Sequence, residues 1–315
     1  MPTIIRPLQP ADYPAAAALF TTTEPQHHAS AAAWRNADQQ ASAEHRTVRY
    51  SALAGEPPQL VGYGAFWRVR EDKYRLELIV APGWRRHGIG GRLMREMLDA
   101  LALHGAATVQ ARTDEEDLEA LTFLWRYGFV ETQRLYRLRL DIVTAPPAPW
   151  QAAAAQLAAQ GIAISTLAYE RAHDPNALHK LYALHTAANA SWPDPDPGPQ
   201  VKLGFEEYLR RFTQEAMVPE GVFIARLGEQ YVGYSALVAS PTVPQQLQAA
   251  GTVVRPEWQR HGIATALKLR TIGFAQQQGY SAIIAHAADP TLLAINIRLG
   301  FRRERGEVRL VLTLT

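Results

Sequence analysis

The sequence of 315 residues predicts a mixed α/β sheet fold that occurs twice in tandem. The first observation is a strand, loop and helix between Leu76 and Leu98. An apolar run breaks there at Pro82, passes through a basic, glycine-rich turn and continues with apolar residues at helical spacing. The second observation is a repeat of this stretch between Val253 and Ala264, which keeps the proline, the tryptophan and the run Arg-His-Gly-Ile.

Two further landmarks recur at nearly the same distance along the chain. The run Val61-Gly62-Tyr63-Gly64-Ala65 matches Val232-Gly233-Tyr234-Ser235-Ala236, and Arg126-Tyr127-Gly128-Phe129 matches Arg298-Leu299-Gly300-Phe301. Because three landmarks repeat in the same order, the chain contains two copies of one domain.

The first copy has the expected element order βα(α)βββαβαβ. Pro10-Ala11-Asp12 starts an Ala-rich helix, Ser30 is a plausible N-cap of a second helix, and Gly55-Glu56-Pro57-Pro58 signals the turn of an antiparallel hairpin. The expected strands are 3–8, 46–53, 60–68, 76–80, 107–112 and 129–142, and the expected helices are 10–20, 30–40, 89–103 and 114–127, the last capped at Gly128.

A proline-rich segment at 144–149 separates the copies because it has no apolar period. We therefore expect a first domain at 1–143, a Pro/Ala-rich linker at 144–160 and a second domain at 161–315. The helix expected at 151–160 could be a tether or a packing element. In the second copy we expect strands at 162–167, 222–225, 231–238 and 281–285, helices at 176–187, 205–212, 263–278 and 291–299, and a Pro/Asp insert at 191–199.

The repeated loop has the composition of a phosphate-binding site. The first N–H groups of a helix lack partners inside the helix, and the helix dipole places positive charge there, so main chain alone can bind a phosphate. Glycine lets the backbone approach the ligand closely. A P-loop is excluded because no Gly-Lys-[Ser/Thr] follows, and a dinucleotide fingerprint is excluded because its third glycine and acidic partner are missing. The alternative is a basic helix N-terminus with no ligand.

The pattern Val-x-Pro-x-Trp-[Arg/Gln]-x-x-Gly-Ile-[Gly/Ala], with Gly-Phe about 40 positions later, resembles the acetyl-CoA signature of the GNAT superfamily of N-acetyltransferases. The resemblance covers both halves and implies two tandem GNAT (acyl-CoA N-acyltransferase) domains with acetyl-CoA as the cofactor. It implies that Val80 and Val254 bind the pantetheine arm through their backbone. The residues implied to hold the pyrophosphate are Arg85, Arg86, His87, Gly88, Ile89, Gly90 and Gly91 in the first copy and Gln259, Arg260, His261, Gly262, Ile263, Ala264 and Thr265 in the second.

The catalytic groups are less well defined. Many members of the superfamily use a Glu on the middle strand or a strand-bound water as base, and a Tyr four positions before the Gly-Phe glycine as acid. Leu124 and Asn296 occupy the two Tyr positions here. Asn296 resembles an asparagine that contacts coenzyme A, or it is bonded within its helix, whereas we expect Leu124 to lie in the core. Glu77 is a candidate base in the first copy, or a solvent-facing residue. The second copy has Gly251 at that place.

Two further candidates belong to the second copy, each with a plainer alternative. His286, expected just past a strand end, is a candidate base or a surface histidine. Asp194 and Asp196 of the insert could attract a cationic amine, or could belong to a solvated loop. We expect Trp84 and Trp258 to pack beside the loops as structural anchors.

Composition excludes several other functions. A net charge of +2 from 32 basic and 30 acidic residues gives no reason to expect a nucleic-acid partner. The absence of cysteine excludes disulfides and a thiolate nucleophile, and the ten histidines show no zinc-binding spacing. The start lacks an apolar signal core and no apolar run is long enough to cross a bilayer, so we expect a cytoplasmic protein with no membrane partner.

The expected function is direct transfer of an acetyl group from acetyl-CoA to the amine of a small molecule in a ternary complex. We expect the second copy to be the active one because of Asn296 and the additional loop, and the protein to be a monomer or homodimer. The alternative is a non-catalytic acyl-CoA-binding sensor or scaffold, because the usual acid is missing from both copies.

Overall fold

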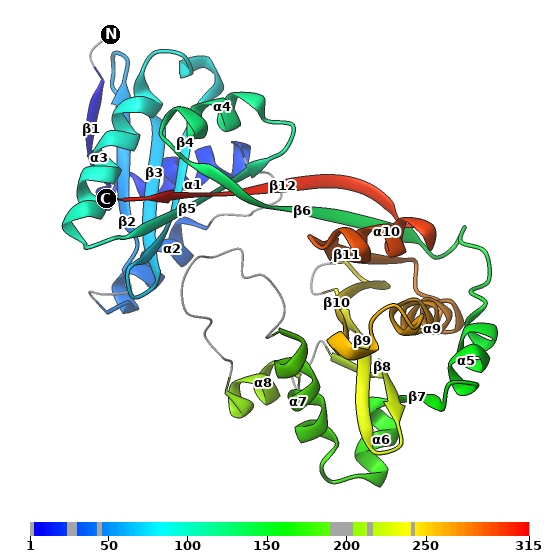
Figure 1. The fold of residues 1–315 in the computed structure, drawn as a ribbon. Helices are drawn as coiled ribbons and strands as arrows, with labels where there is room; N and C mark the ends of the chain where they lie inside the picture. The colour runs from blue at the N-terminus through cyan, green and yellow to red at the C-terminus, as the bar shows by residue number, and fades with distance from the viewer. Residues whose placement is uncertain are drawn as a thin grey trace. The chain divides into compact units, whose positions relative to one another are not determined.

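The computed structural model describes residues 3–23, 30–42, 46–189, 204–212, 217–240 and 243–314 (Figure 1). The chain forms two compact units. Unit 1 contains residues 1–133 and 308–315, and unit 2 contains residues 134–307. Each unit is a sheet with helices on its faces, which confirms the predicted mixed α/β class.

Unit 1 has the predicted order of elements. They are β1 (Ile4–Pro7), α1 (Tyr13–Thr23), α2 (Ala31–Gln40), β2 (Val48–Ala54), β3 (Gln59–Arg70), β4 (Lys73–Val80), a 3₁₀ turn η1 (Pro82–Trp84), α3 (Ile89–Leu103), β5 (Thr108–Asp114) and α4 (Leu118–Arg126). The strands follow the order β1-β2-β3-β4-β5, and the end of β12 (Arg302–Thr313) is next to β5. Strands β1 to β4 are antiparallel, and β4 and β5 are parallel.

Helices cover both faces of the unit 1 sheet because its strand residues alternate in direction. On β4, Leu76 packs with Met94 and Met97 of α3. Ile79 points to the other face, where it packs with Phe20 of α1 and with Tyr63.

Unit 2 repeats this plan and also includes most of β6, the strand at the end of the first copy. Its elements are β6 (Val130–Asp141), α5 (Trp150–Ala158), β7 (Ile162–Thr166), α6 (Leu167–His173), α7 (Ala177–Asn189), α8 (Phe205–Phe212), β8 (Met217–Leu227), β9 (Gln230–Ala239), β10 (Gln246–Val254), η2 (Pro256–Trp258), α9 (Ile263–Gln277), β11 (Ala282–Ala287) and α10 (Pro290–Arg298). The strands follow the order β6-β11-β10-β9-β8-β7. Helix α6 separates the strand and the helix predicted at 162–167 and 176–187. The predicted insert with Asp194 and Asp196 lies outside the described residues.

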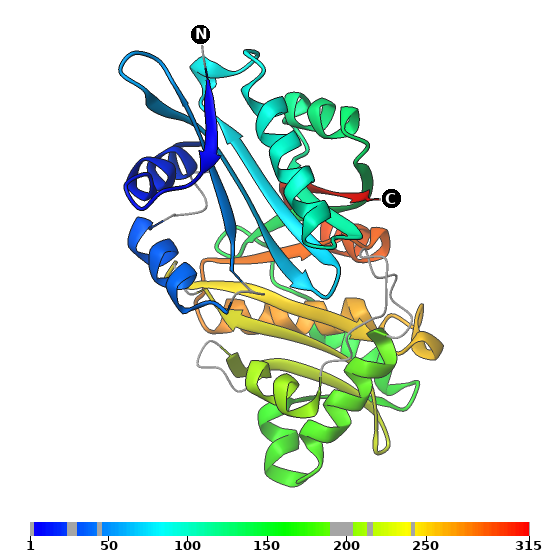
Figure 2. The same ribbon diagram turned by 90° about the vertical axis from the view of Figure 1, so that its left-hand side faces the viewer.

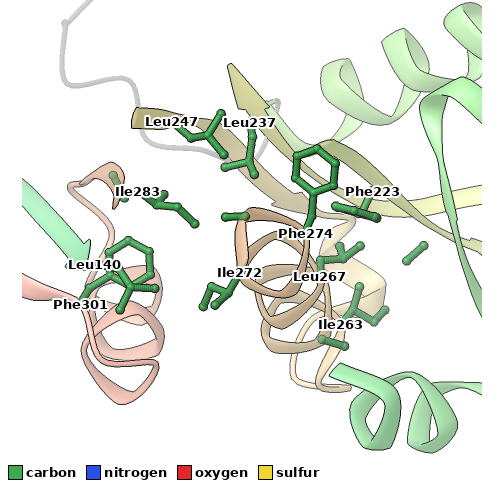
Figure 3. Close-up of a cluster of buried hydrophobic side chains, with 14 of the residues drawn as sticks. Leu140, Phe223, Leu237, Leu247, Ile263, Leu267, Ile272, Phe274, Ile283 and Phe301 are labelled. Carbon is green, nitrogen blue, oxygen red and sulfur yellow. The ribbon is translucent and has the colours of Figure 1, made fainter. Parts of the chain in front are cut away.

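Helix α9 forms the core of unit 2 against one face of the sheet, and α7 packs on the other face (Figure 2). Figure 3 shows side chains of α9, among them Leu267 and Phe274, next to Phe223 and Leu237 of the strands. No helix within the described ranges is long and apolar enough to cross a membrane.

The segment predicted as a linker is part of unit 2. The Arg270 guanidinium of α9 lies 3.8 Å from the centroid of the Trp150 ring of α5. The Gln276 side chain donates to the Pro146 carbonyl at 2.9 Å and accepts from the Ala148 N–H at 3.0 Å. Of the two roles considered for the helix at 151–160, the packing role therefore applies, because α5 is fixed to α9.

The last strands also depart from the predicted domain limits. The sequence assigns 129–142 to the first domain and the chain end to the second. In the structure Leu138 and Leu140 of β6 are buried in the unit 2 core, where β6 pairs with β11. Val308 and Leu310 of β12 are instead buried in the unit 1 core. Each unit thus completes its sheet with a strand segment from the other half of the sequence, which local pattern could not reveal.

The repeated Val-Gly-Tyr motif is explained by close packing of a helix on a strand. A Cβ on Gly62 would lie 3.1 Å from Ile89 and Leu93 of α3. A Cβ on Gly233 would lie 3.0 Å from Ile263 of α9 and 3.0 Å from the Val253 carbonyl. A side chain at either position would therefore be tight where the helix begins to cross its sheet, and glycine relieves this contact.

We expect Gly233→Ala to lower the free energy of unfolding by about 1–3 kcal/mol, because the added methyl overpacks this contact. Gly83→Ala is the matched control, since a Cβ there meets nothing within 4 Å. Thermal unfolding of both variants checks the prediction, and an equal loss in the control would contradict it.

We expect Leu310→Ala to destabilise unit 1 and Leu140→Ala to destabilise unit 2, each by about 2–5 kcal/mol. Hydrogen exchange followed by mass spectrometry locates the effect. If Leu310→Ala increased exchange in β8 to β11 and spared β3 to β5, the assignment of β12 to unit 1 would be wrong.

Candidate active site

The loop after β4 makes two turns that only certain residues adopt easily. The Ala81 N–H donates to the Val61 carbonyl at 2.9 Å, which holds the strand end, and Pro82 then starts the 3₁₀ turn η1. Arg86 (φ 64°) and Gly88 (φ 78°) follow in the left-handed region. Gly88 then caps α3, whose first bond runs from the Arg92 N–H to the Gly88 carbonyl at 3.1 Å.

Unit 2 has the same loop geometry. The Arg255 N–H donates to the Val232 carbonyl at 2.9 Å, and Arg260 (φ 66°) and Gly262 (φ 82°) take the left-handed conformation. The first bond of α9 runs from the Ala266 N–H to the Gly262 carbonyl at 3.0 Å. We call the two loops with their helix N-termini, residues 85–91 and 259–265, cradle 1 and cradle 2.

Both cradles can bind an anion through the main chain. In cradle 1 the N–H groups of Ile89, Gly90 and Gly91 precede the first bond of the helix, and in cradle 2 those of Ile263, Ala264 and Thr265 do so. The helix dipole adds positive potential at this place. His87 and His261 occupy equivalent positions, with Nδ1 at 2.7 Å from the Arg85 carbonyl and 2.9 Å from the Gln259 carbonyl.

A gap between parallel strands lies beside each cradle. Strand β4 pairs with β5 only from Lys73 to Arg75, and β10 pairs with β11 only from Gln246 to Gln248. Beyond these residues β4 continues to Val80 and β10 to Val254, and no described strand pairs with either of them on that side. The parallel strands therefore diverge before the proline in each unit, and the opening has the form needed for an extended arm.

The two cradles differ in their surroundings. Glu119 of α4 lies 3.7 Å from Arg85 and 3.9 Å from Arg86, and the sequence has Thr291 at the equivalent place in unit 2. The Tyr127 hydroxyl donates to the Gly91 carbonyl at 3.1 Å, so α4 is held against the start of α3. Cradle 1 therefore has internal partners that would compete with a phosphate.

Unit 2 has polar residues beneath α9 where unit 1 has apolar ones. The Ser235 and Thr252 hydroxyls bond to each other at 2.9 Å, and Leu78 occupies the place of Thr252 in unit 1. Lys268 replaces Met94 and is 5% exposed. Burial lowers the pKa of Lys268 to about 8.

Leu124 and Asn296 occupy the two positions at which the superfamily commonly has a catalytic tyrosine. Leu124 is in the unit 1 core, as expected. Asn296 is 2% exposed, and its side-chain Oδ1 has no hydrogen-bond partner among the described residues. An orphaned buried acceptor of this kind fits a ligand that donates a hydrogen bond, as the amides of pantetheine do.

The candidate bases lie in different settings. Glu77 is on the α1 face of β4, with its side chain 22% exposed and 3.8 Å from Arg112, so it is half-buried and ion-paired rather than simply solvent-facing. The prediction that His286 follows a strand end is wrong, because β11 continues to Ala287 and His286 pairs with Arg137 within the sheet. Its side chain is exposed.

Two equivalent tyrosines were identified in the sequence only as landmarks. Tyr63 is bonded by the Arg49 guanidinium, which also binds Asp38, and it stacks on Trp34 at 5.2 Å. Tyr234 instead bonds to His185 of α7 at 3.1 Å between the hydroxyl and Nδ1. Burial raises the pKa of both tyrosines. Their recurrence at one motif position was the signal that could have identified them.

The fold and the paired cradles define a tandem acyl-CoA-type transferase architecture. The profile of the acetyltransferase (GNAT) family matches residues 13–129 and 179–301. The chain belongs to this family and is an N-acetyltransferase; members of the family use acetyl-CoA as the acyl donor.

Similar proteins agree with this assignment. The chain is 26% identical over 233 residues to a mycothiol acetyltransferase of Thermobispora bispora, covering 72% of each chain. It is 26% identical over 286 residues to that of Cellulomonas flavigena, covering 86% of this chain and 76% of the relative. The tandem layout thus resembles that of mycothiol synthase, as the arrangement of motifs in the sequence also indicates.

Solved structures show the same fold. A GCN5-related N-acetyltransferase from Sphaerobacter thermophilus has a TM-score of 0.69 at 19% identity, with 99% of this chain and 95% of that chain covered. A tandem GNAT protein from the clavulanic acid biosynthesis pathway has a TM-score of 0.61 at 18% identity, with 99% and 98% covered.

We expect Asn296→Leu to leave the thermal stability unchanged or raised, because it removes an orphaned polar group from the interior. The same variant should bind acetyl-CoA several-fold to about tenfold more weakly, since one hydrogen bond contributes about 0.5–1.5 kcal/mol. Calorimetric titration and thermal unfolding check both parts. Unchanged affinity would show that Asn296 does not contact the donor.

Proposed function

We propose that unit 2 transfers the acetyl group of acetyl-CoA to the amine of a small molecule. The observation that carries this proposal is the combination of cradle 2, the gap beside β10 and the orphaned Oδ1 of Asn296. In unit 1 the corresponding places have Arg85 and Arg86 ion-paired with Glu119, and Leu124 in the core.

The residues of cradle 2 have defined roles in this proposal. The N–H groups at the start of α9 and the side chains of Gln259, Arg260 and Thr265 would hold the diphosphate. The backbone of Val254 would bind the extended arm along the open side of β10, and Asn296 would accept a hydrogen bond from it. The bound donor supplies an acyl thioester, and the protein orients it toward the amine.

The transfer would be direct. The chain has no cysteine to form a thioester of its own, so the amine would attack the bound donor in a ternary complex. The acceptor class follows from the family and from the relatives named mycothiol acetyltransferase, and amines related to mycothiol therefore come first in an acceptor panel. Glu77 and His286 remain candidate bases of units 1 and 2.

The test is Gly262→Val. A β-branched residue at φ 82° is strained by at least about 1–2 kcal/mol, so we expect acetyl-CoA to bind about tenfold or more weakly. Thiol release with a panel of primary amines should fall in parallel. Calorimetry and a thiol-reactive dye measure the two quantities.

Gly279→Val is the matched control, because Gly279 has φ 72° and open space but lies at the far end of α9. Gly88→Val makes the same change in cradle 1 and should leave turnover largely intact. Undiminished turnover in Gly262→Val, with loss in Gly88→Val and Glu77→Gln, would move the reaction to unit 1. Tight binding by the unaltered protein without turnover of any amine would favour a binding function.

A further inference from the structure

The position equivalent to Glu77 of unit 1 has no side chain in unit 2. Gly251 occupies it, and the two copies share the same strand register there, with Ala65 opposite Glu77 and Ala236 opposite Gly251. A Cβ on Gly251 would have a single neighbour among the described atoms within 4 Å, the Tyr234 hydroxyl at 3.8 Å. The position therefore lacks a carboxylate but borders a hydroxyl.

The Tyr234 side chain lies on the side of β9 that is covered by α7. Tyr234 lies opposite Val253, next to the residue at which β10 ends. Both side chains belong to the buried cluster beneath α7. Tyr234 is thus near the open stretch of β10 that leads into cradle 2.

His185 of α7 completes the arrangement. Its Nδ1 is 3.1 Å from the Tyr234 hydroxyl. In the tautomer with the ring proton on Nε2, Nδ1 accepts a hydrogen bond from the Tyr234 hydroxyl, and this is the tautomer that the inference requires. In unit 1 the equivalent Tyr63 hydroxyl accepts from Arg49, a permanent cation that cannot take up a proton.

Several other ionisable groups near His185 belong to the described residues. The Tyr208 ring of α8 is 4.9 Å from the His185 ring, and Tyr182 packs on Tyr208. On the neighbouring elements, Glu170 of α6 pairs with Tyr231 and Arg226, Lys180 of α7 with Asp174 and Glu229, and Glu207 of α8 with Arg210. Strand β10 presents Gly251 and Val253 on this side. The imidazole is thus the group of this cluster whose ordinary pKa lies near neutrality.

We propose that Tyr234 is a catalytic residue of unit 2 and that His185 is its positioning and proton-accepting partner. The inference rests on the proposed function. The amine nitrogen forms a bond to the acetyl carbonyl carbon, and the carbon–sulfur bond breaks with its electron pair on sulfur. The amine proton passes to the Tyr234 oxygen as the tyrosine proton passes to His185 Nδ1. The thiolate takes a proton from water, and the imidazolium returns one to water.

We expect Tyr234→Phe and His185→Gln to lower kcat by about 10²-fold or more, the usual contribution of a positioned proton acceptor. Wild-type kcat/KM should rise with pH as His185 loses its proton, and this limb should vanish in His185→Gln. Acetyl-CoA affinity measured by calorimetry should stay within about twofold of the wild-type value, because neither residue belongs to the cradle. Stopped-flow thiol release from acetyl-CoA and a panel of primary amines measures the rates.

Two controls separate this role from packing. Tyr63→Phe makes the same change in unit 1 and should leave kcat and the pH profile unchanged. His179→Gln changes another histidine of α7, one that stacks on Phe205 of α8 at 4.1 Å, and should do the same.

A second readout needs no turnover. Nitrogen-15 NMR of the free protein should show the neutral His185 ring protonated at Nε2, and Tyr234→Phe should shift its titration. A ring protonated at Nδ1, or a wild-type pH profile in both variants, would overturn the inference while leaving the proposed function intact. Absence of thiol release by the wild-type protein with every amine would overturn the proposed function, and the inference with it.

Discussion

The structure depends on the close approach of one helix to one strand in each unit. Gly62 and Gly233 lack the methyl group that would collide with the first turns of α3 and α9. Because these contacts fix where each helix begins, they also fix the position of its free N–H groups relative to the ends of β4 and β10. The left-handed turns at Gly88 and Gly262 then bring the chain from the strand into the helix within a few residues. An anion site made of main chain needs this rigidity, because no side chain can compensate for a misplaced amide.

The two copies share this frame but differ in the groups around it. In unit 1 these surroundings are apolar side chains, the ion pair of Arg85 with Glu119, and Tyr63, which is hydrogen-bonded by Arg49. Unit 2 retains polar groups in its interior, including Asn296, Lys268 and the hydroxyl pair Ser235 and Thr252. Buried polar groups destabilise a core unless they are bonded or serve a ligand. Most of the buried polar groups among the described residues lie in unit 2.

Much of the fold could be predicted from the sequence because its elements are locally encoded. The strand, loop and helix around Gly88 follow from apolar spacing, proline and glycine, and the repeat transfers the prediction to Gly262. The loop geometry of the cradles could be predicted for the same reason, since the backbone amides at the start of α3 and α9 are positioned by local geometry.

Features that depend on distant residues could not be predicted. Nothing in the pattern of 129–142 or 302–313 indicates in which core the side chains are buried, because either sheet edge would satisfy an alternating strand. The side-chain partners of Glu77 and Tyr234 could not be predicted from the sequence for a similar reason. Arg112 and His185 come from separate elements, and only the folded sheet brings them close.

The exchange of strand segments has a consequence for synthesis of the chain. During synthesis on a ribosome, all of unit 2 emerges before residues 308–315. The sheet of unit 1 therefore lacks the strand next to β5 until the second copy has been synthesised. Neither copy could be separated by cutting the chain once between them, because each fragment would lose a strand that its core requires.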